Sequence, residues 1–148
     1  INLKKKFILN SFFLFLLGAL SSLSLPPFNL FFINFFTFSI FFIFLFKNKS
    51  LKFQKTLFFY YGWLFGFGYF FTNIYWITIS LTFDQNFVFL VPIALILVPA
   101  FLSLFYGIIS LIFYLIKLNS LISNFLLFSL LFGIIEFIRG NILTGFPW

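Results

Sequence analysis

Long apolar runs separated by short polar breaks dominate this chain. Each run is close to the roughly 20 residues that an α-helix needs to cross the hydrocarbon core of a bilayer. Prolines or clusters of polar residues end most runs, because proline lacks a backbone N–H and disfavours helix before it. The pattern predicts an all-α integral membrane protein with about five transmembrane helices, at about residues 7–25, 30–46, 57–81, 87–116 and 125–143.

Two of these runs allow a second interpretation. In the first run, an apolar core follows Lys4–Lys6 and is followed by Ala19-Leu20-Ser21, as at the cleavage site of a signal peptide. This run is long for a signal peptide and more runs follow, which favours an uncleaved span.

The fourth run contains Pro92 and Pro99. Cutting it there would leave a first piece too short to cross the bilayer, so one tilted or kinked helix with a short interfacial start is favoured.

Composition supports a membrane protein and excludes several kinds of site. Hydrophobic residues make up 64% of the 148 residues and charged residues 7%, whereas a soluble domain is roughly a quarter charged. The chain has no Cys and no His, which excludes a thiol nucleophile, an imidazole base and a Cys/His metal site within it. We therefore expect no catalytic residue, no metal and no cofactor here. A start at Ile1 rather than Met and an end at Trp148 suggest a fragment.

The net charge of +7 indicates how the chain is oriented in the membrane rather than nucleic-acid binding. The lysines stand at the edges of the apolar runs, at Lys4–Lys6, Lys47–Lys55 and Lys117, and form no continuous basic stripe. Flanking lysines mark the cytoplasmic side of membrane spans. Five spans place every lysine on that side, with the N-terminus in the cytoplasm and Asp84 and the C-terminal segment outside.

Glu136 and Arg139 are the first candidates for a site, since they lie near the outer end of the fifth run. Their spacing of three residues places them on one helix face. Ionisable groups within a membrane are costly and usually face a bundle interior or a water-filled cavity. Two interpretations stay open: a polar site for a lipid headgroup or a partner domain, or a self-neutralising pair with Arg139 reaching toward the interface.

Two further segments carry candidate residues. After Arg139 the chain ends in Gly and Pro, which stop a helix, and in Trp, which favours the membrane interface; the candidates there are Thr144, Gly145, Phe146, Pro147 and Trp148. An ordinary helix end is the simpler interpretation. In the third run, Gly62 and Gly66 form a GxxxG pair that favours close helix packing. Asn73 and Trp76 follow, and Asn73 suits a hydrogen bond across helices better than a ligand contact.

Residues 136–148, EFIRGNILTGFPW, resemble the segment E-[WF]-[LI]-R-G-x-[LI]-x-T-G-F-P-W of bacterial apolipoprotein N-acyltransferases. Weaker similarities follow in the family's order. Residues 25–28 resemble the turn after its first span, residues 62–76 its glycine-rich span ending in Trp, and residues 102–107 its fourth span. The resemblance covers nearly the whole chain.

The resemblance implies a multi-pass enzyme of the bacterial inner membrane, with the segment 136–148 facing the periplasm. Members carry a periplasmic nitrilase-like domain after these spans, with a Glu-Lys-Cys triad whose Cys takes an acyl chain from a phospholipid. The acyl group then passes to the N-terminal diacylglyceryl-cysteine of an apolipoprotein. Residues 1–148 would be the membrane portion, a monomer that binds no nucleic acid. The family segment assigns lipid binding or domain docking to Glu136, Arg139 and residues 144–148, with Asn73 and Trp76 as further candidates.

Two other classes of function fit the hydropathy alone. A small transporter or channel subunit would explain the proline-containing fourth run and the membrane ion pair. However, transporters tend to show paired repeats, and no second half is visible in the sequence. A structural membrane subunit would explain the apolar runs but not the specific segment at residues 136–148.

Overall fold

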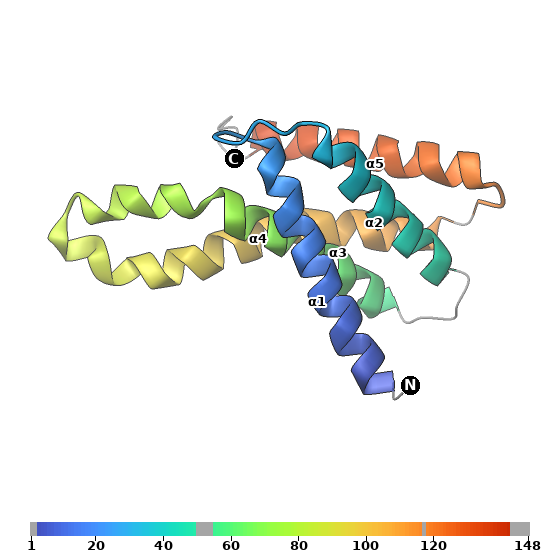
Figure 1. The fold of residues 1–148 in the computed structure, drawn as a ribbon, viewed down its shortest axis with the longest axis horizontal. Coiled ribbons are helices and arrows are strands. Elements are labelled where there is room, and N and C mark those ends of the chain that lie inside the picture. Colours follow the sequence, from blue (N-terminus) through green and yellow to red (C-terminus); the bar gives the residue numbers. More distant parts are fainter. Residues whose placement is uncertain (1–2, 50–54, 117, 143–148) are drawn as a thin grey trace.

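The computed structural model describes residues 3–49, 55–116 and 118–142, which are helical with short connections and contain no strand. The all-α prediction is confirmed for this part of the chain. Figure 1 shows the arrangement. The α-helices are α1 Leu3–Ser21, α2 Ile33–Lys49, α3 Lys55–Asn73, α4 Val91–Leu115 and α5 Leu121–Ile142, and the 3-10 helices are η1 Ser22–Ser24, η2 Tyr75–Thr82 and η3 Gln85–Leu90.

Three helical segments within the described residues are long and apolar enough to cross a membrane. They cover Lys5–Ser24, Gln85–Leu115 and Leu121–Ile142. The other two α-helices are shorter or less apolar: α2 has 17 residues and α3 has 19, including glycines and tyrosines. The molecule is thus a helical membrane protein, and the count of five spans stays a prediction.

The length of the third apolar run predicts one continuous helix over residues 57–81. The structure instead divides this run into two helical segments. The α-helix stops at Asn73, and the chain continues as the 3-10 helix η2. Thr72 turns its hydroxyl back to the carbonyl of Gly68, at 2.8 Å. The α-helix therefore ends inside an apolar run, at a point that hydropathy alone does not mark.

Prolines position α4 without dividing it. Pro92 lies in the first turn, where the missing N–H has no helical partner to lose. Pro99 lies inside the helix, and the Ser103 hydroxyl donates a hydrogen bond to the Pro99 carbonyl. The fourth run is thus η3 followed by one α-helix of 25 residues.

Glycines let α3 approach two neighbours at once. A Cβ placed on Gly62 or Gly66 would collide with the Tyr106 and Ser103 region of α4. A Cβ placed on Gly68 would collide with the backbone of α1, and one on Gly18 of α1 would meet the Phe65 carbonyl of α3. The predicted GxxxG pair lies where α3 packs on α4, as small residues at helix crossings do.

Stacked phenylalanines fill the space between α2, α3 and α5. The Phe41 and Phe65 rings are parallel, with centroids 4.2 Å apart. Phe128 of α5 meets the edge of Phe41 at 5.9 Å, and Phe132 meets Phe38 at 5.2 Å. Such aromatic pairs add to the stability gained from burial, so part of the Phe-rich composition builds the core.

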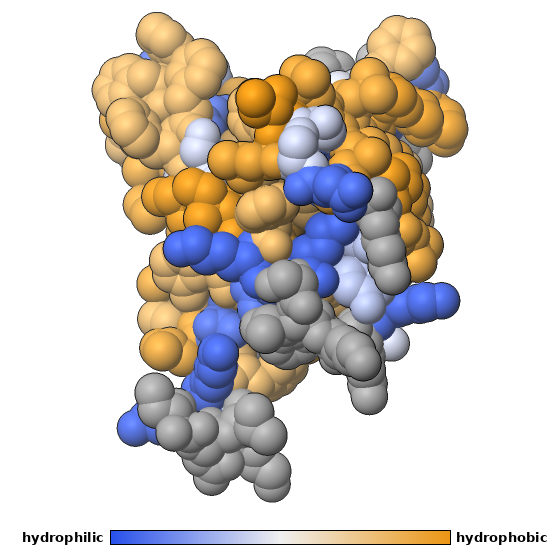
Figure 2. Space-filling model, turned by 90° about the vertical axis from the view of Figure 1, so that its right-hand side faces the viewer, coloured by the Kyte–Doolittle hydropathy of each residue, from blue (hydrophilic) through white to orange (hydrophobic). Residues whose placement is uncertain are grey.

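Five lysines lie at one end of the bundle, which we call the lysine end. They are Lys5, Lys6, Lys47, Lys49 and Lys55. Figure 2 faces it and shows hydrophilic residues bordered by apolar ones. Away from this end, Figure 1 shows η2, η3 and the first turns of α4 extending past α1, α2 and α5.

Candidate functional site

Glu136 and Arg139 form an ion pair one turn apart on α5. Arg139 Nη2 lies 2.5 Å from Glu136 Oε2, and Nε lies 3.2 Å from the same oxygen. The Arg139 side chain is 9% exposed and that of Glu136 is 37% exposed. The guanidinium therefore lies inside the helix bundle, while the carboxylate reaches its edge.

Side chains from α3 and α4 complete the surroundings of Arg139. The Phe70 ring of α3 lies under the guanidinium, with Arg139 Cζ 5.4 Å from the ring centroid. Tyr106 of α4 meets Phe70 edge-on at 5.4 Å and is 2% exposed. Tyr69 and Tyr106 lie close enough to interact electrostatically with both Glu136 and Arg139. Three helices thus fix one buried cation against aromatic faces.

The two carboxylate oxygens of Glu136 differ. Oε2 accepts both hydrogen bonds from Arg139. Oε1 is buried and has no described donor within hydrogen-bond distance, although the Tyr106 hydroxyl lies near the same carboxylate. A buried acceptor without a donor costs about 1–3 kcal/mol. This oxygen is therefore where a donor group of a ligand or of another part of the protein would gain most.

The pair lies at the end of α5 that points away from the lysine end. From Asn124, beside Lys49, to Arg139 the helix axis rises about 22 Å. Residues Thr144, Gly145, Phe146, Pro147 and Trp148 follow directly and lie outside the described residues.

Asn73 and Trp76 lie further along α3 and η2. Asn73 ends α3, nearly one turn beyond Phe70. Trp76 lies on η2 and is 49% exposed. The grouping of Asn73 and Trp76 with the ion pair stays a prediction.

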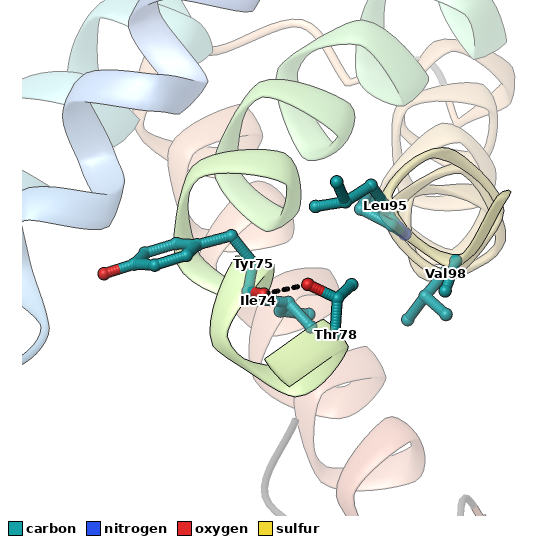
Figure 3. Close-up of a pocket in the computed structure, with 7 residues that line it drawn as sticks. Ile74, Tyr75, Thr78, Leu95 and Val98 are labelled. Atoms are coloured by element: carbon teal, nitrogen blue, oxygen red, sulfur yellow. Dashed lines mark hydrogen bonds between the residues drawn. The ribbon is translucent and has the colours of Figure 1, made fainter. Parts of the chain in front are cut away.

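An apolar pocket lies beside these residues, between η2 and α4. It is small, with an enclosed space of about 10 Å³, which is roughly the room that one water molecule needs. Figure 3 shows Ile74 and Thr78 on one side and Leu95 and Val98 of α4 on the other. Thr78 donates its hydroxyl to the Tyr75 carbonyl at 2.6 Å, and the Tyr75 ring points away from α4 (Figure 3). The pocket therefore offers mainly hydrocarbon surface.

Phe70 is the residue of this site that sequence reasoning missed. It is one of 32 phenylalanines, and nothing in its local pattern marks it as the support of a cation. Tyr106 had a weak signal, since it falls within residues 102–107, the stretch similar to the family's fourth span. Only the folded arrangement joins both residues to Arg139.

Residues 17–148 match the family described as the apolipoprotein N-acyltransferase N-terminal domain. The chain belongs to this family. Among curated relatives, the apolipoprotein N-acyltransferase of Brucella melitensis is 35% identical over 146 residues, which cover 90% of this chain and 26% of that protein. The one of Rhodopseudomonas palustris is 37% identical over 141 residues, with 90% and 25% covered.

The enzyme of Rhizobium rhizogenes is 34% identical over 140 residues, with 90% of this chain and 26% of the relative covered. The chain thus spans about a quarter of the length of the curated relatives it matches. No solved structure shows significant similarity to it. Membership of the apolipoprotein N-acyltransferase family, predicted from residues 136–148, is confirmed.

Proposed function

We propose that these residues form the membrane portion of an apolipoprotein N-acyltransferase of the bacterial inner membrane. The enzyme would move an acyl chain from a phospholipid to the N-terminal diacylglyceryl-cysteine of a lipoprotein. The family match across residues 17–148 carries this proposal. This match favours an acyltransferase over a transporter, a channel or a structural subunit. Those three alternatives are supported mainly by the hydropathy of the chain.

The covalent chemistry would belong to a nitrilase-like domain that follows these helices. There a Cys thiolate would attack an ester carbonyl of the phospholipid, form a thioester and release a lysophospholipid. The lipoprotein amine would then attack the thioester, so that an amide bond forms, the C–S bond breaks and a proton leaves the nitrogen. Dividing one transfer into two steps is the usual logic of covalent catalysis. Glu136 has a different role, since its carboxylate pairs with Arg139.

The ion pair would bind a polar group at the outer end of the bundle. Arg139 provides a fixed cation on the Phe70 ring, and Glu136 Oε1 provides a buried acceptor that the described residues leave without a hydrogen bond. Together they match a group that carries both an anion and a donor, such as a phospholipid headgroup. The small apolar pocket lies between α4 and η2, which follows α3 beyond Phe70. An acyl chain would lie against its hydrocarbon surface rather than enter it.

All five α-helices would cross the membrane, with the lysine end in the cytoplasm and the ion pair toward the periplasm. Helix ends that gather the lysines support this orientation. The shorter α2 would span about 25 Å, and local thinning of the bilayer accommodates such a mismatch at modest cost.

Complementation of a strain depleted of its own N-acyltransferase tests the proposed activity. The complete gene that encodes this chain should restore lipoproteins with three acyl chains, as read by mass spectrometry of their N-terminal peptides. Its Arg139→Ala variant should restore far less at equal membrane abundance. Failure of the unaltered gene to produce any triacylated lipoprotein would refute the proposed activity. Full restoration by the variant would refute only the role of Arg139.

A further inference from the structure

Five helix ends meet at the lysine end, and their contacts hold it together. Lys49 of α2 donates to the Ile116 carbonyl after α4 at 2.6 Å and to Asn124 Oδ1 of α5 at 2.8 Å. The Phe7 ring of α1 stacks on Tyr60 of α3 at 5.5 Å. The Phe58 ring of α3 packs on Tyr114 of α4 at 4.5 Å and links these two groups of contacts. The starts of α1, α3 and α5 and the ends of α2 and α4 therefore lie on one side of the bundle (Figure 2).

This surface has an unbalanced positive charge. Lys5, Lys6, Lys47 and Lys55 are exposed there. Both acidic residues of the chain, Asp84 and Glu136, stand near the opposite helix ends. Neither of these acidic side chains lies at the lysine end, so the positive fields of the lysines add in one place.

An apolar collar adjoins these lysines. On α1, Ile8, Leu9 and Phe12 are 60–66% exposed immediately after Lys5 and Lys6. On α5, Leu121 and Ile122 are 57% and 72% exposed. Exposed apolar surface of this extent on a membrane helix faces lipid chains. Lysines at its border extend their ammonium groups to the depth of the lipid phosphates.

We propose that the lysine end binds the headgroups of anionic phospholipids, such as phosphatidylglycerol, in preference to zwitterionic ones. Lysines near a membrane surface attract anionic lipids. Each lysine that fully contacts the headgroups raises the binding constant roughly fivefold. The collar favours a lipid over a soluble polyanion, because it holds the lysines in the plane of the headgroups. Lys49 has a different role, since its ammonium is already bonded to Ile116 and Asn124. The proposal stands independently of the acyltransferase activity.

Spin-labelled lipids measure this preference directly. The complete gene product is reconstituted in nanodiscs of phosphatidylcholine with a trace of acyl-chain-labelled phosphatidylglycerol or phosphatidylcholine. The immobilised fraction in the electron spin resonance spectrum reports which lipid binds the protein. We expect phosphatidylglycerol to be favoured about fivefold at low salt and the preference to shrink strongly at about 0.5 M NaCl.

Two matched variants decide whether these lysines are responsible. The quadruple variant K5Q/K6Q/K47Q/K55Q should bind both lipids equally, whereas K5R/K6R/K47R/K55R should keep the preference. Equal binding of both lipids by the unaltered protein would overturn the proposal, as would a preference that survives in a folded glutamine variant. Salt-sensitive binding of an oligonucleotide without any lipid preference would also overturn it. If the glutamine variant does not fold, the salt response and the arginine variant decide.

Discussion

Lys49 Nζ lies 2.8 Å from Asn124 Oδ1. The ammonium group at the end of α2 thus donates a hydrogen bond to a side chain in the first turn of α5. The same ammonium lies 4.2 Å from the centroid of the Phe113 ring of α4. Asn124 is fully buried, and its amide nitrogen donates to the carbonyls of Leu118 and Ser120. One lysine thus joins three helices through a buried amide.

Lys49→Met should lower the free energy of unfolding by about 1–3 kcal/mol, because Asn124 Oδ1 would remain buried without its donor. Methionine keeps much of the aliphatic stem, so lost packing is a minor part. Unfolding in mixed micelles, followed by circular dichroism, measures the change. Lys55→Met is the control on an exposed side chain and should stay within about 0.5 kcal/mol of the parent. Equal effects of the two substitutions would show that Lys49 does not join the helices.

Gly18→Ala should destabilise the bundle by about 1–3 kcal/mol, since overpacking forces backbones apart. The added Cβ would collide with the Phe65 carbonyl where α1 crosses α3. Gly133→Ala is the matched control, because a Cβ there meets no heavy atom within 4 Å. It should be neutral or stabilise α5 by up to about 1 kcal/mol. The same micelle unfolding experiment compares them, and a tolerated Gly18→Ala would contradict the close α1–α3 crossing.

The proposed orientation is tested by labelling two exposed positions at opposite ends. Asn86 on η3 and Ser120 before α5 are both exposed. In intact spheroplasts, a membrane-impermeant maleimide should label Asn86→Cys and should label Ser120→Cys only after permeabilisation. The parent protein gives the background from cysteines elsewhere in the complete gene product. Labelling of Ser120→Cys from outside would invert the topology.

Much of the fold could be predicted from the sequence, because long apolar runs and lysines at their edges are signals that do not depend on packing. The change from α-helix to 3-10 helix after Asn73 was missed, since hydropathy does not report the backbone conformation within an apolar run. The starts of α2 and α5 differ from the predicted spans by a few residues. Polar residues such as Asn124 can lie in the first turns of a helix.

The candidate site was predicted in part. Spacing alone placed Glu136 and Arg139 on one face, as i, i+3 pairs are, and the structure joins them. The Phe70 support and the buried Glu136 Oε1 depend on how α3 and α5 approach each other, which no local pattern reveals. The grouping of Asn73 and Trp76 with the pair rests on the family resemblance, which gives order along the chain and not distance in space, so it stays a prediction.

The central claim is that Glu136 and Arg139 bind substrate rather than merely neutralise each other. The double variant E136Q/R139M in the complete enzyme separates these roles, since replacing a buried ion pair by uncharged residues of similar size is often neutral for stability. Transfer of an acyl chain from phospholipid to a diacylglyceryl lipopeptide is measured at equal membrane abundance. We expect a loss of at least about tenfold in turnover, equivalent to ~1.4 kcal/mol. Turnover equal to that of the parent would show that the pair only neutralises itself.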